Sequence, residues 1–406
     1  MKNFRSFLHL PRNVYVLFLA RIINSIGSFV YPLMTILLTQ KLGYSADKAG
    51  TITTVAIAAG GIGMLIGGKI ADHVGRKKLF IITSLLGALT FIACAFLGQS
   101  KSIVYLIIAG NFISIAQWPT VDAMVTDSTN KENRQNAFSL LYLGTNIGIA
   151  VGPLIAGFLI NEHLMWFFLL DGITTLLSLI PVIIFIKDTK PTKEQIEAIP
   201  ETDNERAEKG SVFRAFLKRP LLIAFTSIIV LFTIVYAQYT FGLPLFANSI
   251  YGIDGPKIYG LLMSVNAVMV VVLTIFVISF TKKLPPLVSI TIGGFLYACG
   301  FGMLYFTGNI YLLIVSTIIW TLGEIINTVN IEVFIANNAP VTHRGRFFAL
   351  ITFVQESGFA MSPMLSGFYI ASFGIKNIWP LVALFAFVAA ASMFGLFMWQ
   401  KSLRKI

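Results

Sequence analysis

One stretch decides the fold of this chain: Gly68-Lys-Ile-Ala-Asp72-His-Val-Gly75-Arg76-Lys77-Lys78. It joins two apolar runs, residues 48–71 and 79–98, each close to the roughly 20 residues that a helix needs to cross a membrane. Gly68 and Gly75 permit a close approach and a tight turn, and Arg76 can pair with a carboxylate. A basic loop alone would explain the cations but neither the glycines nor Asp72, so the stretch indicates a specific turn between two membrane helices.

Composition places the whole chain in a membrane. Of its 406 residues 56% are hydrophobic and only 12% are charged, with a mean hydropathy of +0.81. Soluble domains carry about 25% charged residues. The net charge of +12 comes from short basic clusters between apolar runs, not from a basic stripe or arm. This pattern is typical of cytoplasmic loops and excludes nucleic-acid binding as the reason for the charge.

Walking along the chain gives twelve runs long enough to span, and helices are expected because lipid cannot satisfy free backbone polar groups. The predicted spans are 14–39, 48–71, 79–98, 102–126, 136–160, 164–186, 220–247, 258–280, 286–306, 311–337, 347–370 and 376–400. The polar segment between the sixth and seventh cannot span. We therefore expect an all-α membrane protein with an N-terminal six-helix bundle (1–186), a cytoplasmic central linker (187–219) and a C-terminal six-helix bundle (220–406).

The distribution of Lys and Arg predicts the orientation. With the N-terminus inside, the short inside segments hold 15 Lys and Arg residues and the outside segments hold 5. Cytoplasmic loops carry the excess of positive charge. Both termini are therefore expected in the cytoplasm of a multi-pass protein of the cell membrane.

The two halves resemble one another at an offset of 210 residues. Arg134 matches Arg344, Gly148 matches Gly358, Pro153 matches Pro363 and Gly157 matches Gly367. An ordered set of matches over two consecutive spans indicates duplication. Transporters are often built from such repeats, with the binding site near the middle of the membrane between the halves.

The fifth predicted span carries small residues at regular spacing, followed by a proline: Gly144, Gly148, Gly152, Pro153 and Gly157. Glycines four apart let another backbone pack closely, and a proline in mid-span can bend a helix. Generic helix packing would explain small residues four apart, but the full glycine–proline spacing is a more specific pattern.

Acidic residues at membrane depth are functional hypotheses, because a charge there costs at least about 2.5–3.5 kcal/mol. Glu324 lies near the middle of span ten and shares a helix face with Asn327. Glu356 lies about ten residues into span eleven. A structural and a functional role are equally open for three further acids: Asp122, Asp171 and Glu332.

Arg21 is the one basic residue well inside the first span, and it can pair with a buried carboxylate or an anionic substrate group. We place a set of polar and aromatic residues at a substrate cavity: Arg21, Tyr31, Tyr142, Asn146, Tyr236, Gln238, Tyr239, Glu324 and Asn327.

The turn at 68–78 resembles the signature loop of the major facilitator superfamily, and the resemblance extends over essentially the whole chain. The glycine–proline spacing of span five resembles the antiporter motif of its drug/proton exporters. Residues 125–134 and 321–325 are similar to LmrP-type multidrug/proton antiporters. This resemblance implies proton and cationic-drug binding at Glu324 and a cytoplasmic lock that uses Asp72 and Asp127.

Arg134, which closes the matching stretch at 125–134, is placed with this cytoplasmic gate, together with Gly68, Gly75 and Arg76. Asn111 lies near where drug exporters commonly carry an arginine, and Leu141 and Thr240 lie where an acid is expected.

We therefore expect a monomeric, proton-coupled exporter of lipophilic or cationic drug-like compounds that works by alternating access, with protons at Glu324 and Glu356. An uptake symporter or metabolite exporter, or a lipid flippase of the same fold, stays open as an alternative. No P-loop, nucleophile motif or metal-ligand spacing occurs in the sequence, and Cys94 and Cys299 stand alone in apolar runs. We expect neither an enzyme nor a cofactor or metal site.

Overall fold

The computed structural model describes residues 10–129, 133–189, 216–281, 283–306, 308–338 and 344–403, and these residues form helices and no strand. Nine helical stretches within them are long and apolar enough to cross a membrane. One of the nine, Pro220–Thr274, has 55 residues and holds the predicted spans 220–247 and 258–280. The predicted spans at 14–39 and 347–370 correspond to α2 with the segments after it, and to α17. The twelve-helix, all-α prediction is confirmed.

The chain divides into two units. Unit 1 contains residues 1–193 and 247–268, and unit 2 contains residues 194–246 and 269–406. The first part of α14 (Gly255–Thr281) thus packs with the N-terminal unit. Most of the predicted linker 187–219 lies outside the described residues, and the exact division into two six-helix bundles stays a prediction.

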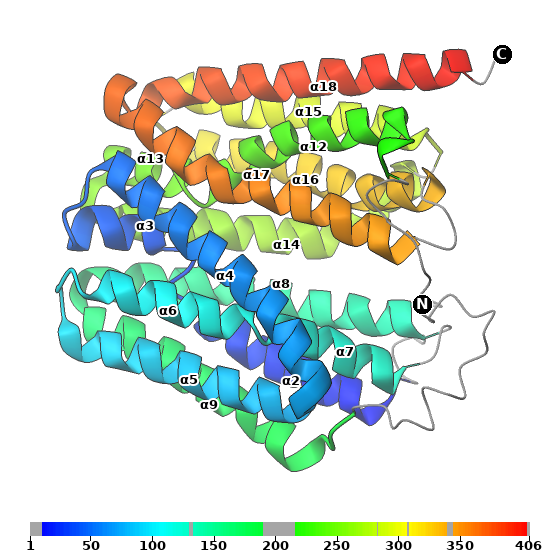
Figure 1. Ribbon diagram of the computed structural model, residues 1–406. Coiled ribbons are helices and arrows are strands. Elements are labelled where there is room, and N and C mark those ends of the chain that lie inside the picture. Colours follow the sequence, from blue (N-terminus) through cyan, green and yellow to red (C-terminus); the bar gives the residue numbers. More distant parts are fainter. Residues whose placement is uncertain are drawn as a thin grey trace, which may run out of the picture. The chain divides into compact units, whose positions relative to one another are not determined.

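In unit 1, α2 packs against α8 and α9, α4 against α6, and α5 against α6 and α9 (Figure 1). The core contains Val14, Leu17, Met124, Ala137 and Val182, which share one buried cluster. The helices are α2 (Arg12–Gly27), α3 (Met34–Ile36), the π-helical turn η1 (Leu37–Lys41), α4 (Ala46–Val74), α5 (Arg76–Leu97), α6 (Ile103–Ile115), α7 (Trp118–Ser128), α8 (Arg134–Glu162) and α9 (Leu164–Phe185).

In unit 2, α15 lies against α16 and α18, and α12 lies against α17 and α18 (Figure 1). Large aromatic side chains fill its interior, among them Trp320, Trp379, Phe225 and Phe301. The helices are α12 (Pro220–Tyr236), η2 (Ala237–Tyr239), the first part of α13 (Gly242–Tyr251), the last part of α14, α15 (Pro286–Met303), η4 (Leu304–Phe306), α16 (Ile310–Asn338), α17 (Arg344–Phe373), η6 (Ile375–Asn377) and α18 (Ile378–Leu403). The end of α13 and η3 (Gly252–Asp254) belong to unit 1.

The first and seventh spans are broken, which the sequence analysis did not predict. α2 ends at Gly27, and the chain turns through residues 28–33 before α3 begins. In the seventh span, a 3-10 turn and two further residues separate α12 from α13. Hydropathy is continuous through both breaks, so composition gives no sign of them. The two breaks begin after Gly27 and after Tyr236, 209 residues apart, and thus nearly follow the offset of the internal repeat.

Large apolar side chains cover the outside of the helices. Phe96 is 71% exposed and Leu65 is 57% exposed, and many other large apolar side chains are exposed as well. Water-soluble proteins rarely expose apolar surface on this scale. The exterior is that of a multi-pass membrane protein.

Candidate functional site

The turn between α4 and α5 requires glycine at position 75. Gly75 has φ +104°, which residues with a side chain rarely adopt, and a Cβ atom there would overlap the carboxylate of Asp188. The backbone of the turn and the end of α9 therefore approach one another directly. This places Arg76, the next residue, at the N-terminus of α5.

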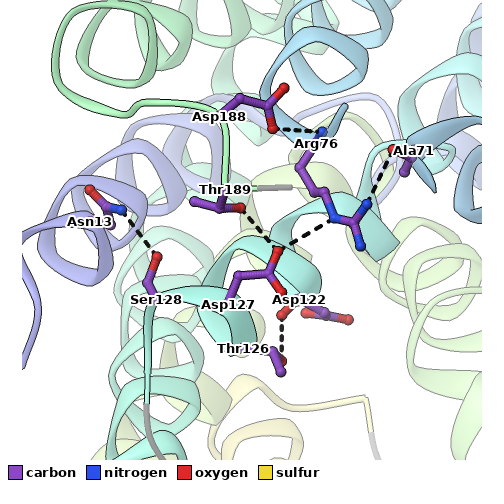
Figure 2. Close-up of polar contacts among 9 residues, drawn as sticks. All are labelled: Asn13, Ala71, Arg76, Asp122, Thr126, Asp127, Ser128, Asp188 and Thr189. Atoms are coloured by element: carbon purple, nitrogen blue, oxygen red, sulfur yellow. Dashed lines mark hydrogen bonds and ion pairs between the residues drawn. The ribbon is translucent and has the colours of Figure 1, made fainter. Parts of the chain in front are cut away.

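Arg76 and Asp127, which the resemblance assigns to the cytoplasmic gate, form an ion pair. The Nε atom of Arg76 lies 3.4 Å from Oδ2 of Asp127, at the end of α7, and its Nη1 donates to the carbonyl of Ala71 at 3.4 Å (Figure 2). The two charged side chains are only 14% and 17% exposed. Partial burial limits screening by solvent and favours a defined geometry over a loose surface pair.

Two residues after α9 join this cluster, and the sequence analysis did not assign them to it. Asp188 accepts a hydrogen bond at 3.1 Å from the backbone N–H of Arg76, and Thr189 donates from its hydroxyl to Asp127 at 3.1 Å. An acceptor at the first N–H of a helix satisfies a donor that the helix leaves free, and a negative charge there is favourable. No local sequence signal marks this contact, because Asp188 lies 112 residues from the helix start that it caps.

The gate cluster is defined here as Arg76, Asp127, Asp188 and Thr189. It joins three segments of unit 1: the α4–α5 turn, the end of α7 and the segment after α9 (Figure 2). A hydrogen bond of 3.1 Å from Asn13 to Ser128 ties α2 to the same end of α7. The side chains of Asp72 and Arg134, which the sequence placed in the gate, lie outside the described part of the chain.

The side chain of Arg21 contacts other side chains of unit 1. Its Nε donates to the Thr145 hydroxyl at 2.9 Å, and its guanidinium lies 5.6 Å from the ring centre of Trp118. Asp122, on α7, attracts it electrostatically. Thr145 and Trp118 thus fix the position of the guanidinium, and Asp122 acts on it through its charge.

The other predicted cavity residues of unit 1 differ in exposure. Tyr31 and Tyr142 are exposed. Asn146 is buried, and its amide donates to the Tyr142 carbonyl on the same helix at 2.9 Å.

The glycines of α8 lie on close helix contacts. A Cβ at Gly148 would overlap Ser25 of α2, and a Cβ at Gly152 would lie 2.8 Å from the Ile26 carbonyl oxygen. On another side, a Cβ at Gly157 would lie 2.5 Å from the Pro256 carbonyl. The spacing therefore serves contacts with two helices, α2 and α14, and not with one.

Glu324 lies in an aromatic cluster of unit 2. The Tyr236 hydroxyl is hydrogen-bonded to the Glu324 carboxyl, which also interacts electrostatically with Tyr297. The rings of Tyr236 and Tyr239 are 4.6 Å apart, and Trp320 lies 6.3 Å from the first and 6.0 Å from the second. The aromatic cluster is defined as Tyr236, Tyr239, Tyr297 and Trp320.

Two members of this cluster, Trp320 and Tyr297, are not among the residues that the sequence predicted. Trp320 precedes Glu324 by one helical turn, and that spacing could have identified it. Tyr297 comes from α15, and no local pattern brings it to α16. Asn327 is 3% exposed and packs against Gly293 of α15.

Two predicted residues of unit 2 lie elsewhere. Gln238 is buried, and its amide donates to the hydroxyls of Ser362 and Ser366 on α17 at 2.9 and 2.6 Å. Glu356 is exposed on α17, and within the described residues it makes no ion pair. Neither is part of the aromatic cluster.

Comparison with known proteins gives a consistent result. The family description "Major Facilitator Superfamily" matches residues 17–363. The uncharacterized MFS-type transporter YqjV of Bacillus subtilis (strain 168) is 24% identical over 375 residues, which cover 91% of this chain and 88% of the relative. A Na(+), Li(+), K(+)/H(+) antiporter of Planococcus maritimus is 21% identical over 360 residues, covering 82% and 84%.

Among solved structures, a POT family transporter in complex with a thioalcohol conjugated peptide has a TM-score of 0.77. It is 16% identical, and the match covers 96% of this chain and 98% of that one. At this identity the likeness concerns the fold alone.

Proposed function

The chain belongs to the major facilitator superfamily, and we propose that this transporter is a proton-coupled exporter of lipophilic cations. One observation carries the proposal: the Glu324 carboxyl interacts with Tyr236 and Tyr297, and the Tyr236 ring contacts the rings of Tyr297 and Trp320. Aromatic faces attract organic cations by about 0.5–2 kcal/mol each, more when water is excluded. A carboxylate beside them supplies the opposite charge.

Competition at Glu324 provides the coupling in this proposal. A charged carboxylate binds the cation, and a proton on the same group removes the attraction, so one site holds either a proton or a substrate. Exchange of the two across the membrane is antiport.

The gate cluster and the helix contacts of α8 supply the conformational part of the proposal. Arg76, Asp127 and Asp188 tie three segments of unit 1 together, and we propose that these contacts favour the state closed toward the cytoplasm and thereby bias the alternation between two states. We further propose that the protein lies in the cell membrane with both termini in the cytoplasm, which the 15-to-5 distribution of basic residues supports.

Ethidium transport into everted membrane vesicles with an imposed proton gradient tests the proposal. Wild type should accumulate ethidium when the gradient is present and lose it when a protonophore is added. Glu324→Gln should not accumulate it. Glu332→Gln is the matched control, because Glu332 is an exposed acid on the same helix. Equal accumulation by Glu324→Gln and wild type would refute the assignment.

A monovalent-cation/proton antiporter is the second candidate, because a relative of that printed function matches most of the chain. The aromatic cluster favours an organic cation, since small metal cations prefer oxygen ligands. Replacing ethidium by Na⁺ or K⁺ in the same vesicles distinguishes the two. Reversing the proton gradient tests uptake of a metabolite. Labelled lipids in the same vesicles test lipid flipping.

A further inference from the structure

Asp171 of α9 holds the break in the first span. Its Oδ2 accepts hydrogen bonds from the backbone N–H groups of Phe29 at 2.9 Å and Val30 at 3.0 Å. These two residues follow the end of α2, where helical hydrogen bonding stops. Asp171 is 5% exposed, so the contact is closed to solvent.

A break in a membrane helix needs such an acceptor. Backbone N–H groups inside a membrane cannot bond to water, and each unsatisfied group costs several kcal/mol. The equivalent break in unit 2 is held differently: Gln238 bonds to serines of α17, and no carboxylate takes part among the contacts described.

The neighbouring contacts confirm that α2 and α9 meet closely here. Asn24 donates to the Thr175 hydroxyl at 3.2 Å, one turn beyond Asp171. The absence of a side chain at Gly27 allows Thr174 to lie against the end of α2. The last turn of α2 is thereby fixed to α9, and only residues after it depend on Asp171.

The groups around Asp171 indicate that its carboxylate acts as a hydrogen-bond acceptor and not as a partner in an ion pair. Within the described residues no Lys, Arg or His pairs with Asp171 on any helix packed against α9. From α5 the only titratable neighbour is the buried Cys94, and α2 contributes the two N–H groups and the amide of Asn24.

We propose that Asp171 is a positioning residue for the outer part of the first span, the segment from Val30 to Lys41 that includes Tyr31. Its carboxylate fixes where the chain turns, and thereby where that segment lies during the transport cycle. The effect on transport rests on the proposed function, whereas the effect on the segment does not.

Hydrogen exchange of the purified full chain in nanodiscs tests the proposal directly. Asp171→Ala removes the acceptor, and exchange of the Phe29 and Val30 amides should become roughly ten- to a hundredfold faster. Asp171→Asn keeps an acceptor oxygen and should stay close to wild type. Ser178→Ala is the matched control, because this buried hydroxyl on the same helix bonds only to Thr175 of its own helix.

A second readout follows the position of the segment. In a variant with Cys94 and Cys299 replaced, the labelling rate of Tyr31→Cys by a maleimide should change with Asp171→Ala and not with Asp171→Asn. Ethidium transport should likewise change with Asp171→Ala and stay close to wild type with Asp171→Asn. As a control for folding, hydrogen exchange in peptides from α15 should be the same in each variant as in wild type.

The proposal is overturned if Asp171→Ala leaves exchange or labelling unchanged, or alters both without affecting transport. It is also overturned if Asp171→Asn keeps the exchange protection but loses transport, since the charge would then matter and not the acceptor. If wild type does not move ethidium, the proposed substrate class fails, and exchange and labelling still decide the role of Asp171.

Discussion

At the scale of single residues, the gate cluster shows how one carboxylate organises a helix start. Asp188 accepts from the first N–H of α5, while Arg76 itself reaches Asp127. The two contacts act on the backbone and on the side chain of the same residue. Loss of either partner should therefore loosen the turn at Gly75.

Asp188→Ala should lower the stability of unit 1 by about 0.5–2 kcal/mol, because the first N–H of α5 loses its acceptor. Asp188→Asn keeps an acceptor and should cost less than half as much. Thermal unfolding of the purified variants in detergent measures both. Equal stability of Asp188→Ala and wild type would show that the contact is incidental.

Thr189→Val removes one hydrogen bond to Asp127, worth about 0.5–1.5 kcal/mol. If the gate cluster stabilises one of two transport states, the balance between them should shift by roughly two- to tenfold. The rate of ethidium transport at equal protein amounts is the measurement. A change in stability without a change in rate would remove Thr189 from the gate.

The contacts of single residues were only partly predictable from the sequence. Arg76 and Asp127 were both assigned to the gate, because the stretches 68–78 and 125–134 resemble family motifs. Asp188 and Tyr297 were not predicted, because each reaches its site through the packing of distant helices. Sequence spacing reports neighbours along one helix, and it carries no information on which other helix lies opposite.

At the scale of elements, the glycines of α8 set the distance to its neighbours. A Cβ at Gly148 would lie 2.7 Å from the Ser25 backbone carbon, so α2 and α8 would have to move apart. We expect Gly148→Ala to destabilise the protein by about 1–3 kcal/mol. Detergent melting curves provide the measurement.

Gly61→Ala is the matched control for that substitution. Gly61 lies in α4, and nothing comes within 4 Å of a Cβ built there. It should be neutral or stabilising by up to about 1 kcal/mol, because alanine favours the helix. Similar losses at both positions would show that helix packing at α8 is not specially tight.

Element boundaries were predicted well where hydropathy changes and missed where it does not. The polar turn at Gly75 and the glycine motif of α8 were visible in the sequence. The breaks after Gly27 and Tyr236 lie inside continuous apolar runs, and hydrogen bonds from other helices stabilise them. A single run of sequence therefore cannot reveal them.

At the scale of the whole molecule, twelve spans with both termini inside is a topology that labelling can check. Asn204→Cys lies in the central linker and Asp254→Cys in the exposed turn η3. In a background without Cys94 and Cys299, an impermeant thiol reagent added to intact cells should label position 254 and not position 204. The reverse pattern would invert the orientation.

The central claim is that a proton and a lipophilic cation compete for Glu324. Proton release on binding tests this most directly: tetraphenylphosphonium is added to purified protein in weakly buffered detergent, and the pH change is recorded. Wild type and Glu332→Gln should release protons as the cation binds, and Glu324→Gln should release none. Cation binding by wild type without proton release, or equal release by Glu324→Gln, would contradict the account.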